Sequence, residues 1–294
     1  MVFKKTAIFD TSGLNRLFDD HDRDCLVAGL SAGYRVFFTG NNISEIIATG
    51  ATTRRTQLLD FCLPFLSAGG MCLQPFNSVI QRVCAPFDPR AVAPLSWQRI
   101  DVRFRESEQE MVRREFVDDE LSAEERSANR KLEAEFKSIF DNPREHFQKL
   151  FENGIEARPA GLAELVSRLQ DGGAFWTIAK DLYERGAEKD ALDNDGIRKL
   201  LRECPPFHAL MLAYCMAQYE GCIRDFTQTP VSYRAGRVDL LSAVFLPYCD
   251  VFVTNDARQN RCFIEIESVG RFGAEIVLYD AFKSSLTLMP VISR

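Results

Sequence analysis

The sequence predicts an α/β domain with a mainly parallel sheet, interrupted by a mostly helical insertion. In the first third of the 294-residue chain, short apolar segments alternate with helical patterns, an order that builds parallel sheets. From about residue 105 to 226 the pattern is almost entirely helical and highly charged. The alternation of strand and helix then returns, so both ends of the chain are expected to build one sheet.

The N-terminal third contains short runs of apolar, β-branched or aromatic residues that predict strands at 6–10, 35–39 and 71–73. Between them, apolar spacing and capping residues predict helices at 22–32, from Asn41 or Asn42 to about 48, and at 53–66. Gly69-Gly70 ends the last of these helices before the third strand.

The middle of the chain begins with residues 75–94, which hold four prolines and few periodic apolar positions, so a connector is expected there. Ser122 and Glu125 have the spacing of a capping box at the start of a charged helix, which Asp141-Asn142-Pro143 ends. Apolar spacing predicts further helices at 160–170, 174–186, 193–203 and 206–224.

The C-terminal part is predicted to contain helix 238–248, strand 251–254, helix 258–269, strand 275–278 and a short helix at 281–286. We therefore expect the α/β domain to comprise residues 1–94 and 229–294. The helical insertion is expected to comprise residues 95–228.

Composition excludes several classes of protein. A hydrophobic fraction of 46% and a charged fraction of 27% are typical of a globular protein with a sizeable core. No apolar run is long enough to cross a bilayer, and the N-terminus lacks the pattern of a signal peptide, so a cytoplasmic protein without membrane contact is expected. The net charge of −6 argues against general coating of nucleic acid, although it allows a local basic patch.

The nine cysteines are scattered, odd in number and without a C-x-x-C pair, and only three histidines are present. A structural zinc site needs clustered thiolate or imidazole ligands, so this distribution argues against one. Most of the cysteines are expected to be small buried apolar residues.

Four acidic residues are predicted to meet at one edge of the sheet. Asp10 ends the first strand, and Asp256 follows the strand at 251–254. Glu45 is expected in the first turn of the helix after the second strand, and Asp239 opens the helix that precedes Asp256. In open α/β sheets, ligands bind in the crevice at the carboxyl ends of the strands.

Such a group of carboxylates favours a cation. Two negative charges about 5 Å apart repel by roughly 3 kcal/mol at an effective dielectric constant near 20. The group therefore takes up a proton or binds a positive ion. Oxygen ligands alone favour Mg²⁺ or Mn²⁺, and the reaction that such an ion supports is hydrolysis of a phosphodiester bond.

The order of these acids along the chain resembles the acidic pattern of PIN-domain ribonucleases. The resemblance covers about residues 3–75 and 230–288. It is carried by Asp10-Thr11-Ser12, Ser44-Glu45, Asp239 and Asp250-Val251-Phe252-Val253-Thr254-Asn255-Asp256. Compact members of that family have one or two helices where this chain has more than a hundred residues, which leaves substrate access and target choice undefined.

The resemblance implies a PIN-like three-layer α/β/α fold and a metal-activated water that cuts single-stranded RNA. It implies that Asp10, Glu45, Asp239 and Asp256 are both catalytic and metal-binding, with Mg²⁺ or Mn²⁺ as cofactor. Thr254 would orient Asp256 through a hydrogen bond, as in the family's Thr-x-Asp. Further hydrogen-bonding support would come from Thr11, Ser12 and Asn255.

Basic and aromatic residues flank the acids in the sequence. Arginines follow Glu45, precede Asp239 and follow Asp256, where they are placed to hold phosphates: Arg54, Arg55, Arg234, Arg237, Arg258 and Arg261. Among them, the substrate-binding candidates are Arg54, Arg55, Arg237 and Arg258. Bases of single-stranded RNA stack on aromatic rings, and the nearby candidates are Tyr233, Phe245 and Tyr248.

Simpler roles exist for each acid alone. Asp10 and Asp256 are also suited to capping a turn or helix, and Glu45 to balancing a helix dipole.

The whole chain could likewise be a catalytically inactive PIN-like scaffold that binds protein or RNA. Single-stranded RNA is the expected partner, ahead of DNA. A homo-oligomer, an inhibitory partner protein and a role as a toxin remain open, because small relatives often act as toxins restrained by a partner.

Overall fold

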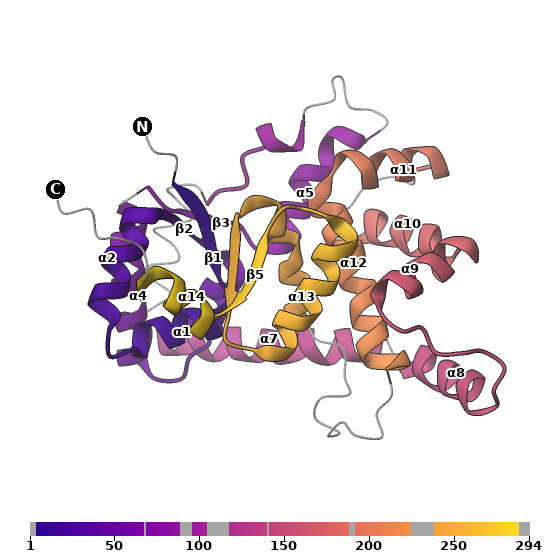
Figure 1. Ribbon diagram of the computed structural model, residues 1–294, viewed down its shortest axis with the longest axis horizontal. Helices are drawn as coiled ribbons and strands as arrows, with labels where there is room; N and C mark the ends of the chain where they lie inside the picture. Colours follow the sequence, from indigo (N-terminus) through magenta and orange to yellow (C-terminus); the bar gives the residue numbers. More distant parts are fainter. Residues whose placement is uncertain are drawn as a thin grey trace.

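The structure, a computed structural model, describes residues 4–67, 69–88, 96–104, 118–139, 141–187, 192–224 and 238–287 (Figure 1). These residues form one sheet of five parallel strands in the order β3-β2-β1-β4-β5. The strands are β1 (Lys5–Phe9), β2 (Tyr34–Thr39), β3 (Met71–Leu73), β4 (Val251–Thr254) and β5 (Glu275–Leu278). Because β1 pairs with β4, the two ends of the chain share one sheet, which confirms the predicted α/β class and the parallel sheet.

Alternate residues of the strands face opposite sides of the sheet and enter two separate apolar clusters. Ile8, Phe37 and Phe252 belong to one cluster, whereas their neighbours in the sequence belong to the other. A parallel sheet covered on both faces needs continuous apolar strands, and this explains the unbroken apolar runs of β1, β2 and β4. The arrangement is compatible with three layers, helices on each side of a sheet.

One face is covered by helices from the two ends of the chain (Figure 1). They are α1 (Thr11–Asp19), α2 (Arg23–Gly33), α3 (Gly40–Ile47), α4 (Thr52–Ser67) and α14 (Tyr279–Thr287). The sequence did not predict α1, whose start directly behind β1 fixes the direction of Asp10 as its N-cap.

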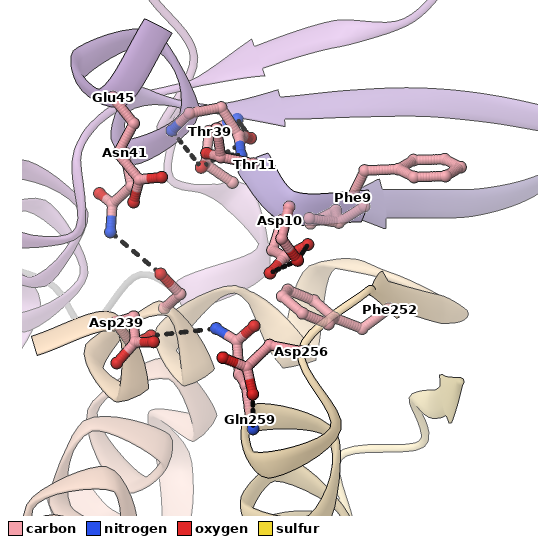
Figure 2. Close-up of a pocket in the computed structure, with 14 residues that line it drawn as sticks. Phe9, Asp10, Thr11, Thr39, Asn41, Glu45, Asp239, Phe252, Asp256 and Gln259 are labelled. Atoms are coloured by element: carbon pink, nitrogen blue, oxygen red, sulfur yellow. Dashed lines mark hydrogen bonds between the residues drawn. The ribbon is translucent and has the colours of Figure 1, made fainter. Parts of the chain in front are cut away.

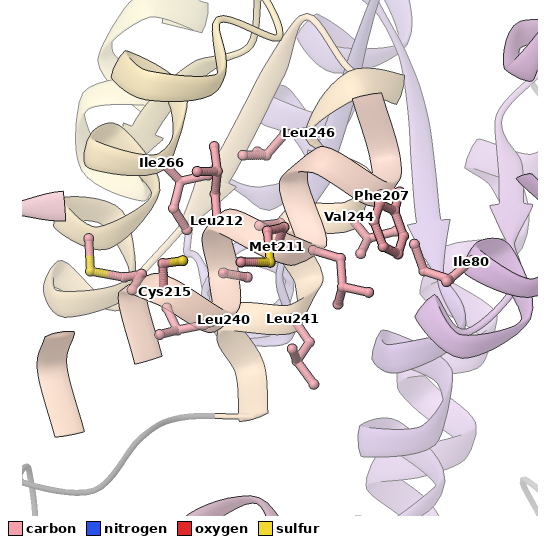
Figure 3. Close-up of a cluster of buried hydrophobic side chains, with 14 of the residues drawn as sticks. Ile80, Phe207, Met211, Leu212, Cys215, Leu240, Leu241, Val244, Leu246 and Ile266 are labelled. Atoms are coloured by element: carbon pink, nitrogen blue, oxygen red, sulfur yellow. The ribbon is translucent and has the colours of Figure 1, made fainter. Parts of the chain in front are cut away.

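The opposite face is covered by α5 (Phe76–Cys84), α12 (Pro205–Gln218), the 3-10 helix η5 (Val238–Tyr248) and α13 (Ala257–Gly270). Outside this layer lie α9 (Leu162–Asp171), α10 (Ala174–Ala187) and α11 (Asn194–Glu203). Figure 3 shows apolar side chains of α12 and η5 gathered in the core, among them Met211, Leu212, Leu240 and Val244. One helix of the predicted insertion, α12, therefore forms part of the layer that covers this face of the sheet. The domain boundaries themselves stay a prediction.

The remaining elements are short or peripheral. They are η1 (Ala85–Phe87), η2 (Trp97–Arg99), α7 (Asp119–Ser138), α8 (Asp141–Glu152) and the π-helix η3 (Tyr219–Ile223). The long helix α7 contacts both α3 and η5 and runs along the lower edge of the molecule in Figure 1.

Three local predictions were wrong. Residues 76–84 form α5 rather than a connector, because prolines flank this segment without interrupting it and four of its apolar side chains are buried. The cap of α3 is Thr39, which shares a capping box with Asn42. Ser122 lies inside α7, and the Asp118 side chain accepts hydrogen bonds from the first backbone amides of that helix. Ser122 and Glu125 therefore form no capping box.

Two further observations concern the class of protein. Among the described residues, no helix is both long and apolar enough to span a bilayer. All nine cysteines are free thiols and seven of them are buried, which confirms that most serve as small core residues.

Candidate functional site

A cavity of about 140 Å³ lies at the carboxyl ends of β1, β2 and β4 (Figure 2). All four predicted acids line it: Asp10, Glu45, Asp239 and Asp256. They come from four separate segments of the chain, and the parallel strand order brings these segments to one edge. We call this cavity the acidic pocket.

Asp10 is half-buried and is held by hydrogen bonds from three residues. Its carboxylate accepts hydrogen bonds from the Gly13 amide at 2.6 Å, the Ser12 hydroxyl at 2.8 Å and the Thr254 hydroxyl at 2.8 Å. Burial raises the pKa of Asp10, these hydrogen bonds oppose the rise, and the negative charge of Asp239 adds to it. A nearby cation would remove this penalty on the charged carboxylate.

Thr254 connects the two strands that carry acids. Its buried hydroxyl donates toward Asp10, lies 2.9 Å from Oε1 of Gln259 and accepts the backbone amide of Asp256 at 3.0 Å. The sequence predicted that Thr254 would orient Asp256. In the structure it contacts the backbone of Asp256 and the carboxylate of Asp10.

The other predicted supporting residues also lie beside the pocket. Ser12 accepts the backbone amide of Asn255 at 2.9 Å, so the exposed Asn255 contributes its main chain to this contact. The Thr11 hydroxyl accepts a hydrogen bond from the Asn42 side chain at 3.1 Å. These contacts tie the start of α1 to the ends of β4 and β2.

Asp256 is the N-cap of α13. Its Oδ1 accepts the amides of Arg258 at 2.8 Å and Gln259 at 3.0 Å. Capping is therefore a real role of Asp10 and Asp256, in addition to their position in the pocket. Because the cap bonds fix the carboxylate beside the cavity, capping and ligand binding are compatible here.

Glu45 and Asp239 approach the pocket from opposite sides (Figure 2). Glu45 is exposed and lies in the second turn of α3, since the helix begins at Gly40 rather than at Asn41 or Asn42. Its placement in the first helical turn was therefore wrong. Asp239 is half-buried in the first turn of η5, as predicted.

Neutral polar residues that the sequence analysis did not assign to the site also line the pocket: Thr39, Asn41, Asn42, Ser242 and Gln259. The Asn41 side chain donates to the Ser242 hydroxyl at 3.1 Å and so joins α3 to η5 across the cavity. Gln259 and Ser242 each lie three residues after a predicted acid, one helical turn along. This spacing places both side chains on the same helix face as an acid, and it could have identified them as pocket residues from the sequence.

The carboxylates are not tightly clustered. Among the described residues, only Asp20, His21 and Asp22 bring three such ligand atoms within 4.8 Å of one another. That group already has a cation, because the Lys283 ammonium lies 2.8 Å from Asp20 and 2.9 Å from Asp22. Burial opposes the ionisation of Asp20, but hydrogen bonds from Lys283, the Asp22 amide and Tyr279 lower its pKa to about 2.

Three of the four predicted substrate-binding arginines, Arg54, Arg55 and Arg258, already contact acidic residues. Arg55 is completely buried and bonds to Asp119, so its predicted contact with substrate was wrong. Arg54 makes a two-point contact with Asp19 and stacks on Phe18. Arg258 pairs with Glu220 and is 12% exposed.

Two of the other candidates fall outside the described residues. These are Arg234 and Arg237. Of the predicted stacking residues, Tyr233 also lies outside the described part of the chain. Phe245 is fully buried and Tyr248 packs against the core, so neither presents a ring for a base.

No family model, curated protein or solved structure matches this chain. The chemistry of the acidic pocket is therefore the basis for inferring function.

Proposed function

We propose that this chain is a PIN-like, Mg²⁺- or Mn²⁺-dependent nuclease that hydrolyses phosphodiester bonds of single-stranded RNA. The observation that carries the proposal is the meeting of Asp10, Glu45, Asp239 and Asp256 in one cavity at the carboxyl edge of the sheet. The acidic pattern that resembles PIN-domain ribonucleases supplies the substrate class.

The donor set fits a hard divalent cation. The pocket lining offers carboxylate, amide and hydroxyl oxygens, and contains neither cysteine nor histidine. Such donors favour Mg²⁺ or Mn²⁺ over zinc. The pocket carboxylates are too far apart to surround an ion completely. This separation suits Mg²⁺, which keeps several of its waters and binds through a few carboxylates. The upward shift in the pKa of Asp10 also favours a positive partner.

When bound, the ion would supply an activated water and neutralise charge on the phosphate. The chain's own contribution is positioning. Asp10 and Asp256 are fixed by hydrogen bonds from backbone amides, and Asp10 also by Thr254. The side-chain NH₂ groups of Asn41 and Gln259 each donate one hydrogen within the protein, and the second hydrogen of each can bind a phosphate oxygen without competing for the cation.

The test is cleavage of labelled single-stranded RNA in the presence of Mn²⁺. The Asp10→Asn and Asp256→Asn variants keep a side chain able to cap a helix but lose the charge. The cleavage rate of each variant is expected to fall about a hundredfold or more. Residues that only orient a metal ligand typically contribute about 10- to 100-fold. Asp24→Asn is the matched control, because Asp24 is 99% exposed on α2. If wild-type protein cuts neither RNA nor DNA faster than Asp10→Asn, the proposal fails.

The alternative is a catalytically inactive scaffold. Two observations favour it: Asp10 and Asp256 both cap helices, and no three acids of the pocket come within 4.8 Å of one another. An inactive scaffold would gain no thermal stability from Mn²⁺, whereas a nuclease with an intact site would.

A further inference from the structure

A buried glutamate is surrounded by three arginines near the start of α13. Glu220 lies in the π-helix η3 and is 2% exposed. Its Oε2 accepts hydrogen bonds from Nε of Arg258 at 2.8 Å and from Nη1 of Arg224 at 3.1 Å. Arg261 lies 3.6 Å from Oε1. We call these four residues the arginine cluster.

The arginine cluster carries more positive charge than its glutamate can balance. One buried carboxylate needs one counter-charge, but three guanidinium groups converge on it. The nearby Glu265 accepts the Leu162 amide at the start of α9, a neutral donor that leaves its negative charge in place, so three arginines against two glutamates still carry one net positive charge. Arg224 and Arg261 are 32% and 46% exposed, so the excess charge is open to solvent.

The position of the cluster connects it with the acidic pocket. Arg258 lies two residues after Asp256, in the first turn of α13. The end of α12 and the start of α13 lie at the lower edge of the molecule in Figure 1, the edge to which the strands point. The π-helix is locally wider than an α-helix, and such segments occur frequently at functional sites.

We propose that the arginine cluster is a phosphate-binding subsite that holds the backbone of single-stranded nucleic acid beside the acidic pocket. The inference rests on the proposed function and adds a specific contact to it. Glu220 is a positioning residue, which fixes Arg258 by two hydrogen-bonding nitrogens, while Arg224 and Arg261 contact the phosphates. A planar guanidinium held in place binds phosphate with little further loss of side-chain freedom.

The experiment measures binding separately from cleavage. Affinity for a labelled single-stranded RNA, and for DNA of the same sequence, is followed by fluorescence anisotropy in EDTA over a series of salt concentrations. Arg224→Gln and Arg261→Gln should each lower the salt slope by about 0.7, the value for one lost phosphate contact on a single strand. Affinity near 0.1 M salt should then fall roughly fivefold.

Two controls separate this effect from general damage. Arg202→Gln removes an arginine that is 70% exposed on α11 and should leave both slope and affinity unchanged. Arg261→Lys keeps the charge and should retain the slope of the wild type.

The possible outcomes distinguish the two proposals. The subsite proposal fails if Arg224→Gln and Arg261→Gln bind as tightly as the wild type, or if the wild type does not bind at all. Either result overturns it whatever the outcome of the cleavage assay. Weakened binding by both variants supports the subsite even if the wild type with Mn²⁺ cuts nothing, in which case the nuclease proposal fails alone.

Discussion

The Thr254 hydroxyl at the end of β4 lies 2.8 Å from a carboxylate oxygen of Asp10 at the end of β1. This contact joins residues 244 positions apart in the sequence and does so inside the protein, where Thr254 is fully buried. The same oxygen of Thr254 also accepts the Asp256 amide. One hydroxyl therefore sets the relative position of two acids that face the same cavity.

Replacing Thr254 by valine keeps the shape of the side chain and removes this hydroxyl. The loss removes one of three hydrogen bonds to Asp10 and the Thr254 partner of Gln259 and of the Asp256 amide, and should lower the free energy of unfolding by about 1–3 kcal/mol. Metal-dependent cleavage should fall about 10- to 100-fold, the range for residues that orient a metal ligand. Thr254→Ser keeps the hydroxyl and is expected to retain most of both. Equal activity of the valine and serine variants would exclude the orienting role.

Asp10→Asn should separate metal binding from folding. The pKa of Asp10 in the folded protein lies above its ordinary value of 3.8. Its contribution to stability is therefore present below about pH 3.8 and is lost as the pH rises through the folded-state pKa. In EDTA at neutral pH, Asp10→Asn is therefore expected to melt at or above the wild-type temperature.

Added Mn²⁺ should reverse that order. At a hundredfold excess over the dissociation constant, an ion that binds only the folded state stabilises it by about 2.7 kcal/mol. The wild type should gain this stabilisation, and Asp10→Asn much less. Identical shifts of the two proteins in a melting experiment with Mn²⁺ would show that the ion binds elsewhere.

The sequence predicted the parts of the site that depend on local pattern. An apolar run followed by an acid marks both Asp10 and Asp256, because a buried parallel strand must end where its first polar residue meets the edge of the sheet. The helix that carries Asp239, η5, was predicted from the apolar spacing of residues 238–248. Glu45 reached the pocket although its helix begins earlier than predicted.

Features that depend on tertiary contacts were not predictable in this way. Arg54 and Arg55 are adjacent, yet one is 28% exposed and the other is fully buried against α7, a helix more than sixty residues away. The pairing of Glu220 with Arg258 likewise depends on how α12 packs against α13. In α5, the prolines obscured a regular apolar pattern, since Pro75 stands before the helix and Pro86 after it.

Glu220→Ala should be strongly destabilising. The substitution leaves three arginines repelling one another around a site that had one buried carboxylate. Removing one partner of a buried ion pair typically costs 3–5 kcal/mol, so a loss of about 3 kcal/mol in the free energy of unfolding is expected by urea denaturation. Glu135→Ala is the comparison, since Glu135 and its partner Lys131 are both exposed, and the effect there should stay below about 0.5 kcal/mol. Similar losses for the two variants would mean that Glu220 is not the counter-charge of the cluster.

The contact of Lys283 with Asp20 should determine how the protein responds to acid. It ties α14 to the end of α1, and with Asp22 and Tyr279 it holds the pKa of Asp20 at about 2, below the ordinary 3.8. The lowered pKa means that this stabilisation is present above about pH 4 and is lost as pH falls toward 2. Lys283→Met should therefore lower the melting temperature at neutral pH and make it depend less on pH between 4 and 2. Lys199→Met, on the exposed side of α11, should keep the wild-type acid profile. If Lys283→Met and Lys199→Met gave the same profile, the acid response would have to come from other carboxylates.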